Sequence, residues 1–178
     1  NIQCRSRIQH FFGCHTWSKW PAAAAAAAAA AERPVIPRRA APDFSGKAVM
    51  PDESFETLSL AQFRDAGRWV VLFFYPFDFT FVCPTEIVAF SDAAAEFDKI
   101  GVDVAAVSTD SHHTHLAWLK TKRDEGGLES LNYPLLADIS KDISRKYGVL
   151  VEDEEDGMNG AALRGLFIVD KAGKIRSV

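Results

Sequence analysis

Two hydrophobic patterns alternate along the chain from about Ala41 onward. Short, almost wholly apolar runs predict buried strands, and longer segments with apolar residues every three or four positions predict amphipathic helices. The predicted strands occupy 69–75, 102–108, 134–137, 165–169 and a last segment from Ile175 in which the chain stops. The predicted helices occupy 59–67, 83–97, 111–125 and 141–147. This alternation indicates an α/β fold built around a largely buried sheet.

Local signals mark the ends of the predicted helices. Ser59 and Gln62 stand three residues apart in a capping-box pattern that opens the first helix. Ser111 is a suitable N-cap for the third helix, which Gly126 is expected to stop. The second helix starts at Cys83, and near-helical spacing predicts its apolar face: Ile87, Phe90, Ala94 and Phe97.

The first 40 residues differ in composition from the rest of the chain. They hold an unbroken alanine run at 22–31 followed by scattered prolines, and their first 31 residues contain basic side chains but no acidic one. We therefore expect a low-complexity leader and linker over 1–40 and a folded domain over 41–178. A basic, acid-free start resembles an organelle transit peptide. The alternative is a mistranslated or artificially added extension.

Composition and charge exclude several classes of protein. The chain has 178 residues, of which 48% are hydrophobic and 25% charged, enough apolar material for a folded core. The net charge of −4 is small and of the wrong sign for a nucleic-acid surface. The longest strongly apolar run, 69–75, is much shorter than the roughly 20 residues of a membrane span. We expect neither nucleic-acid nor membrane partners.

The cysteines and histidines do not form a familiar metal pattern. The three cysteines, Cys4, Cys14 and Cys83, have no CxxC or zinc-finger spacing, which favours a reducing compartment over a secreted, disulfide-bonded scaffold. A site made by Cys4, Cys14 and the adjacent His15 would match no common ligand spacing. A group of three histidines, His112, His113 and His115, begins a predicted helix and includes two adjacent residues, so no metal is expected there either.

Cys83 has the surroundings expected of a reactive thiol. It lies at a predicted strand-to-helix junction, and Pro84 suits the first helical turn. The sulfur would therefore lie at the positive end of the helix dipole, which favours thiolate. Thr80 and Glu86 are polar residues in an otherwise apolar, aromatic stretch. The alternative interpretation, a small buried hydrophobic side chain, stays open at this point.

The stretch FYPFDFTFVCPTEIVAFS around Cys83 closely resembles the peroxidatic-cysteine motif of the typical 2-Cys peroxiredoxins, which are thioredoxin-fold peroxidases. The resemblance continues in the same order along the chain, at 41–44, 107–111, 115–118, 132–135, 147–150 and 163–170. It implies a thioredoxin-like fold, with a central mixed β-sheet flanked by helices. It also implies a thioredoxin-dependent peroxidase that reduces hydrogen peroxide and organic hydroperoxides and takes part in antioxidant defence and cell redox homeostasis.

The resemblance assigns roles to five residues. Cys83 would be the peroxidatic nucleophile, oxidised to a sulfenic acid, and Pro76 would shield its sulfur. Thr80 would donate or accept a hydrogen bond to the peroxide. Arg164 would hold the thiolate and the peroxide oxygens, and Glu86 would orient the guanidinium. The family uses no metal or cofactor, takes electrons from a thioredoxin-like reductant, and forms homodimers and higher rings.

The sequence departs from the family after Cys83, because no cysteine follows it. Typical members resolve the sulfenic acid with a cysteine in a carboxy-terminal arm of the partner subunit, so we expect a chain truncated at its carboxy end. The alternatives are a one-cysteine peroxidase that uses another thiol, or a holdase-type chaperone without turnover. Glu129 also replaces the final glycine of a motif linked to over-oxidation.

The expected location is the cytoplasm, or a mitochondrion or plastid if the leader is a transit peptide, and not outside the cell.

Overall fold

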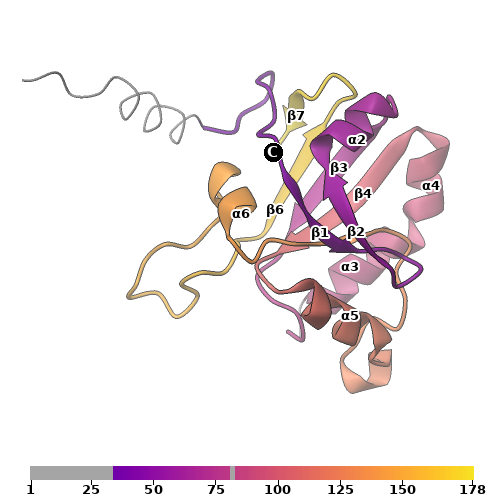
Figure 1. Ribbon diagram of the computed structural model, residues 1–178, viewed down its shortest axis with the longest axis vertical. Helices are drawn as coiled ribbons and strands as arrows, with labels where there is room; N and C mark the ends of the chain where they lie inside the picture. The colour runs from indigo at the N-terminus through magenta and orange to yellow at the C-terminus, as the bar shows by residue number, and fades with distance from the viewer. Residues whose placement is uncertain (1–33, 81–82) are drawn as a thin grey trace, which may run out of the picture. The chain divides into compact units, whose positions relative to one another are not determined.

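The computed structural model describes residues 34–80 and 83–178, and Figure 1 shows their arrangement. The strands are β1 (Ser45–Val49), β2 (Phe55–Ser59), β3 (Trp69–Phe74), β4 (Val102–Ser108), β5 (Leu135–Ala137), β6 (Gly165–Val169) and β7 (Ile175–Ser177). The helices are α2 (Leu60–Asp65), α3 (Cys83–Asp92), α4 (Ala94–Lys99), α5 (His112–Lys120) and α6 (Asp142–Lys146), with a 3₁₀ turn η1 (Arg123–Glu125).

All the described strands belong to one mixed sheet in the order β2-β1-β5-β4-β3-β6-β7. Strands β3, β4 and β5 run parallel, and the flanking strands pair antiparallel. The parallel strands therefore share one carboxyl edge, the edge at which ligands commonly bind in open α/β sheets. The predicted fold class, a mixed sheet flanked by helices, is confirmed.

Helices cover both faces of the sheet. On β3, Val70, Leu72 and Phe74 face a core that includes residues of α2 and α6. Val71 and Phe73 face the other core, which includes residues of α3 and α5. This alternation follows from the two-residue period of a strand. A strand buried on both faces has to be apolar throughout, which explains why 69–75 contains no charged side chain.

Most predicted elements are present, but two helices differ from the prediction. The segment expected to be one helix over 83–97 is two helices that meet at Ala93. Ile87 is buried, whereas the side chains at 90, 94 and 97 are only half-buried. The helix expected to reach Gly126 ends at Lys120, because Thr121 takes an extended backbone. Gly126 instead closes the η1 turn, with φ of +84°. Strands β1 and β2 were not among the predicted elements.

Some predictions fall outside the described residues. They are those for residues 1–33, which cover most of the expected leader, Cys4, Cys14 and the organelle-targeting signal.

The first described residues pair with the end of the chain, because the backbone N–H groups of Arg38 and Ala41 donate to the backbone oxygens of Ile175 and Gly173. Within the described residues, no helix combines the length and the apolar character that a membrane crossing requires.

Candidate active site

The loop that leaves β3 leads directly to Cys83. Tyr75 ends the buried run, its N–H donating to Val107 O of β4 at 3.0 Å, and Pro76 begins the loop. Cys83 is the first residue of α3, as predicted from the sequence. The prediction for its thiol lies outside the described part, because the structure describes no side chain at 83 or 84. The candidate site is therefore built from the residues around this position.

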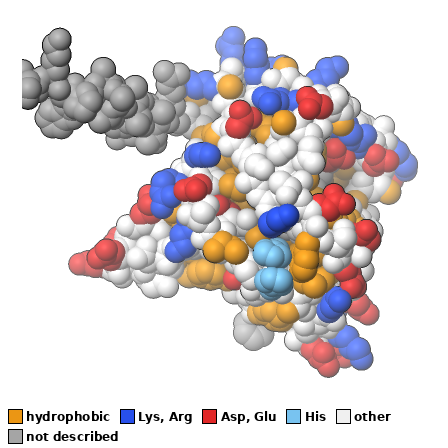
Figure 2. Space-filling view, viewed as in Figure 1, with side chains coloured by type: hydrophobic (Ala, Val, Ile, Leu, Met, Phe, Trp, Pro, Cys, Tyr) orange, Lys and Arg blue, Asp and Glu red, His pale blue; other side chains and the backbone are white. Residues whose placement is uncertain are grey.

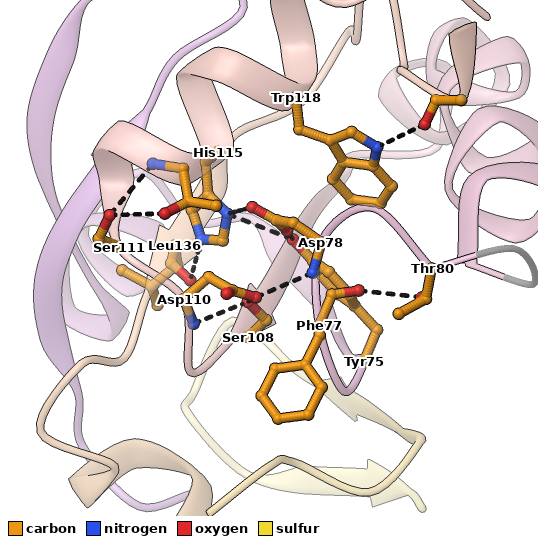
Figure 3. Close-up of polar contacts among 12 residues, drawn as sticks. Tyr75, Phe77, Asp78, Thr80, Ser108, Asp110, Ser111, His115, Trp118 and Leu136 are labelled. Carbon is orange, nitrogen blue, oxygen red and sulfur yellow. Dashed lines mark hydrogen bonds and ion pairs between the residues drawn. The ribbon is translucent and has the colours of Figure 1, made fainter.

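A buried carboxylate anchors the loop at Asp78 (Figure 3). Its Oδ1 accepts a hydrogen bond from Tyr75 Oη at 2.8 Å, and its Oδ2 lies 2.8 Å from His115 Nδ1. The side chains of Asp78 and His115 are 1% and 0% exposed. Burial raises the pKa of Asp78, and the hydrogen bond and charge of His115 act in the opposite direction. The pair links the loop to α5.

A second carboxylate holds the backbone of the same loop. Asp110 Oδ2 accepts a hydrogen bond from the backbone N–H of Asp78 at 2.9 Å. The same oxygen accepts a hydrogen bond from Ser108 Oγ at 2.9 Å. Ser108 is the last residue of β4, and Asp110 lies in the turn that follows it. The neighbouring strand thus fixes the loop that precedes Cys83.

Thr80 is half-buried and lies near the end of this loop. Its hydroxyl donates to the backbone oxygen of Phe77 at 3.0 Å. A threonine hydroxyl has one proton to donate, and its oxygen can still accept. The contact therefore turns the Thr80 oxygen into an acceptor toward other groups.

Arg164 and Glu86, 78 positions apart in the sequence, meet in the structure. Arg164 precedes β6, and Glu86 lies in the first turn of α3, one turn after Cys83. Arg164 Nη1 donates to Glu86 Oε2. The two side chains are 38% and 45% exposed, so solvent reaches the guanidinium. The structure thus brings this predicted pair together, while the expected contact of Arg164 with the Cys83 sulfur stays a prediction.

The sequence analysis missed the anchor formed by Tyr75, Asp78 and His115. From the sequence, His115 was weighed and rejected as a metal ligand together with its two neighbours, and it begins one of the segments, 115–118, that carry the family resemblance. In the structure the ring centroids of His112 and His113 lie 4.2 Å apart, while His115 is fully buried. Figure 2 shows histidine side chains on the surface beside hydrophobic ones. The available signal was a single acid, Asp78, placed inside an aromatic loop, since such a group needs a buried partner.

The described part of the chain contains no group of side chains suited to a metal ion, and two of its cavities lie away from this site. Within residues 34–80 and 83–178, no three His, Cys, Asp or Glu side chains are grouped so that they could hold a metal ion. Two described cavities have volumes of about 260 and 330 Å³. Their lining residues include none of Thr80, Glu86 and Arg164. The candidate site is therefore distinct from both cavities.

Comparisons with known proteins show the family to which this chain belongs. The model of the AhpC/TSA family matches residues 37–178. Peroxiredoxin-2 of Rattus norvegicus is 56% identical over 140 residues, which cover 79% of this chain and 67% of the relative. The reduced 2-Cys peroxiredoxin of Plasmodium vivax has a TM-score of 0.72 and 40% identity, covering 78% of this chain and 68% of that one.

A third similar protein, Prx1a of Plasmodium yoelii, forms an artifactual octamer when it is modified at the N-terminus. It has a TM-score of 0.72 and 40% identity, and the match covers 79% of this chain and 78% of that one. The family resemblance read from the sequence is confirmed by these matches. This chain therefore belongs to the AhpC/TSA family, among the peroxiredoxins, and its fold is similar to that of 2-Cys peroxiredoxins.

Proposed function

We propose that Cys83 is the nucleophile through which this protein reduces hydrogen peroxide and organic hydroperoxides. Membership of the family makes the protein a peroxidase, an oxidoreductase that acts on hydroperoxides. The observation that carries the assignment to this site is the Arg164–Glu86 contact. It brings an exposed guanidinium from the residue that precedes β6 to the first turn of the helix that Cys83 begins.

The proposed step is a two-electron oxidation of the sulfur. The Cys83 thiolate attacks one peroxide oxygen, so an S–O bond forms while the O–O bond breaks. The sulfur becomes a sulfenic acid, the first product of thiol oxidation. The second oxygen leaves with the bonding electron pair, takes a proton, and departs as water or as an alcohol.

Stabilisation of charge contributes more to this step than ionisation of the thiol. An ordinary cysteine is already a few per cent thiolate at neutral pH, so a lower pKa increases the reactive population only about 30-fold. A fixed donor directed at developing negative charge is worth about 3 kcal/mol, or some hundredfold in rate. We assign this role to Arg164, with Glu86 restricting the orientation of the guanidinium.

Thr80 is proposed to bind the peroxide by accepting a hydrogen bond. Its own proton is directed to Phe77 O. Its oxygen is then suited to receive the O–H of a hydroperoxide, a group that both hydrogen peroxide and alkyl hydroperoxides carry. Pro76 begins the same loop and is proposed to shield the sulfur from water. These two roles complete the set of five site residues predicted from the sequence.

Turnover requires a thiol to reduce the sulfenic acid. We propose a thioredoxin-like donor, as the resemblance to 2-Cys peroxiredoxins implies. We also propose that the protein forms homodimers and larger rings, as the resemblance to 2-Cys peroxiredoxins implies. The side chain of Phe79, next to the site, is 50% exposed, and an apolar ring at such a position is suited to a subunit contact.

The test replaces Cys83 alone. Cys83→Ser should abolish peroxide consumption by the reduced protein, and it should abolish trapping of a sulfenic acid by dimedone in mass spectrometry. The matched control, Cys4→Ser with Cys14→Ser, should keep both signals. Peroxide consumption that survives in Cys83→Ser and disappears in the control would overturn the assignment.

A further inference from the structure

We propose that Asp110 is a positioning residue for peroxide reduction and that it acts on Thr80 through the single peptide group between Phe77 and Asp78. This inference rests on the proposed function, because it needs Thr80 to bind the peroxide. It adds a residue from the neighbouring strand end, outside the loop, to the machinery of the site.

One peptide group connects Asp110 to Thr80 (Figure 3). Its N–H belongs to Asp78 and donates to Asp110 Oδ2 at 2.9 Å. Its carbonyl belongs to Phe77 and accepts from Thr80 Oγ1 at 3.0 Å. A trans peptide is planar, so its N–H and C=O are fixed in opposite directions. Any rotation of this peptide that breaks the contact with Asp110 also moves the acceptor that orients Thr80.

The hydrogen bond to Asp110 also strengthens the one to Thr80. A charged acceptor on the N–H polarises the peptide, and its carbonyl then becomes a better acceptor. The Thr80 hydroxyl therefore donates to Phe77 O more strongly than to an isolated carbonyl. Its oxygen is held as the acceptor that the proposed peroxide contact requires.

Asp110 is itself held in place. Its Oδ2 receives the Ser108 hydroxyl, and its own N–H donates to Ser108 Oγ at 3.1 Å. Ser108 is fully buried at the end of β4, which is the parallel neighbour of β3. The carboxylate is therefore fixed relative to the sheet before it contacts the loop. A group that is positioned in this way orients the loop without having to touch the substrate.

The conformation of the loop shows why it needs such an anchor. Phe79, between Asp78 and Thr80, has φ of +56°, a left-handed conformation that bulky side chains rarely adopt. A residue in this region persists only where its surroundings hold it. The carboxylate of Asp78 is held by His115 and Tyr75, and its backbone N–H is held by Asp110. Loss of Asp110 would release the peptide while the side-chain anchor stays.

The experiment compares two reactions of the reduced protein. The first is oxidation by hydrogen peroxide, which needs the acceptor on Thr80, followed by stopped-flow tryptophan fluorescence. The second is alkylation by iodoacetamide, which needs only the thiolate. Asp110→Ala should lower the peroxide rate by about 10- to 100-fold, as expected for a small misplacement of a binding group. It should change the alkylation rate by less than about threefold.

Three further variants separate positioning from folding. Asp110→Asn keeps an oxygen that can accept from the Asp78 N–H and should restore the peroxide rate to within about threefold of the parent. Ser108→Ala removes the hydroxyl that holds the Asp110 carboxylate and should lower the peroxide rate by a smaller factor than Asp110→Ala. This variant tests the inference even if Asp110→Ala does not fold. Asp52→Ala is the matched control. That carboxylate also accepts a backbone N–H and a serine hydroxyl, both from Ser54, in the β1–β2 turn.

A double-mutant cycle with Thr80→Val decides whether Asp110 acts through Thr80. Thr80→Val alone should lower the peroxide rate, and adding Asp110→Ala should lower it no further. If Thr80→Val reacts normally with peroxide, the role of Thr80 in the proposed function fails, and the inference fails with it. If Thr80→Val is slow but Asp110→Ala is not, only the inference is overturned. Additive losses, or equal losses in both reactions, would assign Asp110 a merely structural role and also overturn the inference.

Discussion

The Asp78–His115 pair and the Glu86–Arg164 pair each join a carboxylate to a nitrogen-containing basic side chain, but the first pair is buried and the second is exposed. The first pair is at most 1% exposed and lies 2.8 Å apart under the loop. The side chains of the second pair are 38% and 45% exposed at the start of α3. The buried pair links the loop to α5, whereas the exposed pair leaves the guanidinium of Arg164 accessible to solvent.

The difference in burial sets the energetic role of each pair. Removing one partner of a buried pair leaves an uncompensated polar group, which costs about 3–5 kcal/mol. An exposed pair is worth about 0–1 kcal/mol, because water screens it. We therefore expect changes in the buried pair to appear in stability and changes in the exposed pair to appear in the rate of peroxide reduction.

The largest expected effect comes from His115→Ala. It leaves the Asp78 carboxylate buried without its imidazole and should lower the free energy of unfolding by about 3–5 kcal/mol, measured by urea denaturation. The matched control is His113→Ala on the same helix, where the side chain is exposed and the loss should stay below about 0.5 kcal/mol. Equal losses in the two variants would show that the buried pair does not anchor the loop.

Arg164→Lys tests the exposed pair. The peroxide rate constant should fall by about 100-fold, because a point ammonium lacks the forked donor geometry of a guanidinium. The free energy of unfolding should change by less than about 1 kcal/mol. Arg145→Lys is the control, since Arg145 is similarly exposed and paired with Glu152 and Asp142. Equal peroxide rates in Arg164→Lys and the parent would refute the proposed role.

The smallest expected effect concerns Asp170, a buried carboxylate without a catalytic assignment. Burial acts to raise its pKa, but hydrogen bonds from Lys174 N–H, the Arg176 guanidinium and Ala172 N–H outweigh it. Its pKa in the folded protein therefore lies below the ordinary value of 3.8. The stability it contributes is present above pH 3.8 and is lost as the pH falls through the lower, folded-state pKa.

Asp170→Asn should therefore lower the free energy of unfolding at neutral pH by less than about 2 kcal/mol. The difference from the parent should shrink below about pH 4, which unfolding curves at several pH values would measure. A difference that grows as the pH falls would contradict the lowered pKa. This carboxylate also sharpens the comparison of the two pairs, because it is buried like Asp78 while its pKa shifts in the opposite direction.

Local patterns predicted the parts of the fold that depend on neighbours in the sequence. The strands at 102–108 and 165–169 have the predicted bounds, and Ser59 begins a helix with Gln62 accepting its backbone N–H at 2.6 Å. The start of α3 at Cys83 was also predicted. The break at Ala93 was not, because alanine favours helix and nothing in its own residue type ends one.

The α/β alternation, the position of Cys83 at a strand-to-helix junction and the family of the chain could be predicted from the residues alone, because they depend on local periodicity and on motifs that can be read in order. The contacts between distant side chains became visible only in the fold: Arg164 with Glu86, His115 with Asp78, and Asp110 with the loop backbone. These contacts depend on the pairing of strands far apart in the sequence: β4 lies parallel to β3, and β6 lies antiparallel to β3 with Gly165 opposite Phe74, so that separate chain segments meet at one edge of the sheet.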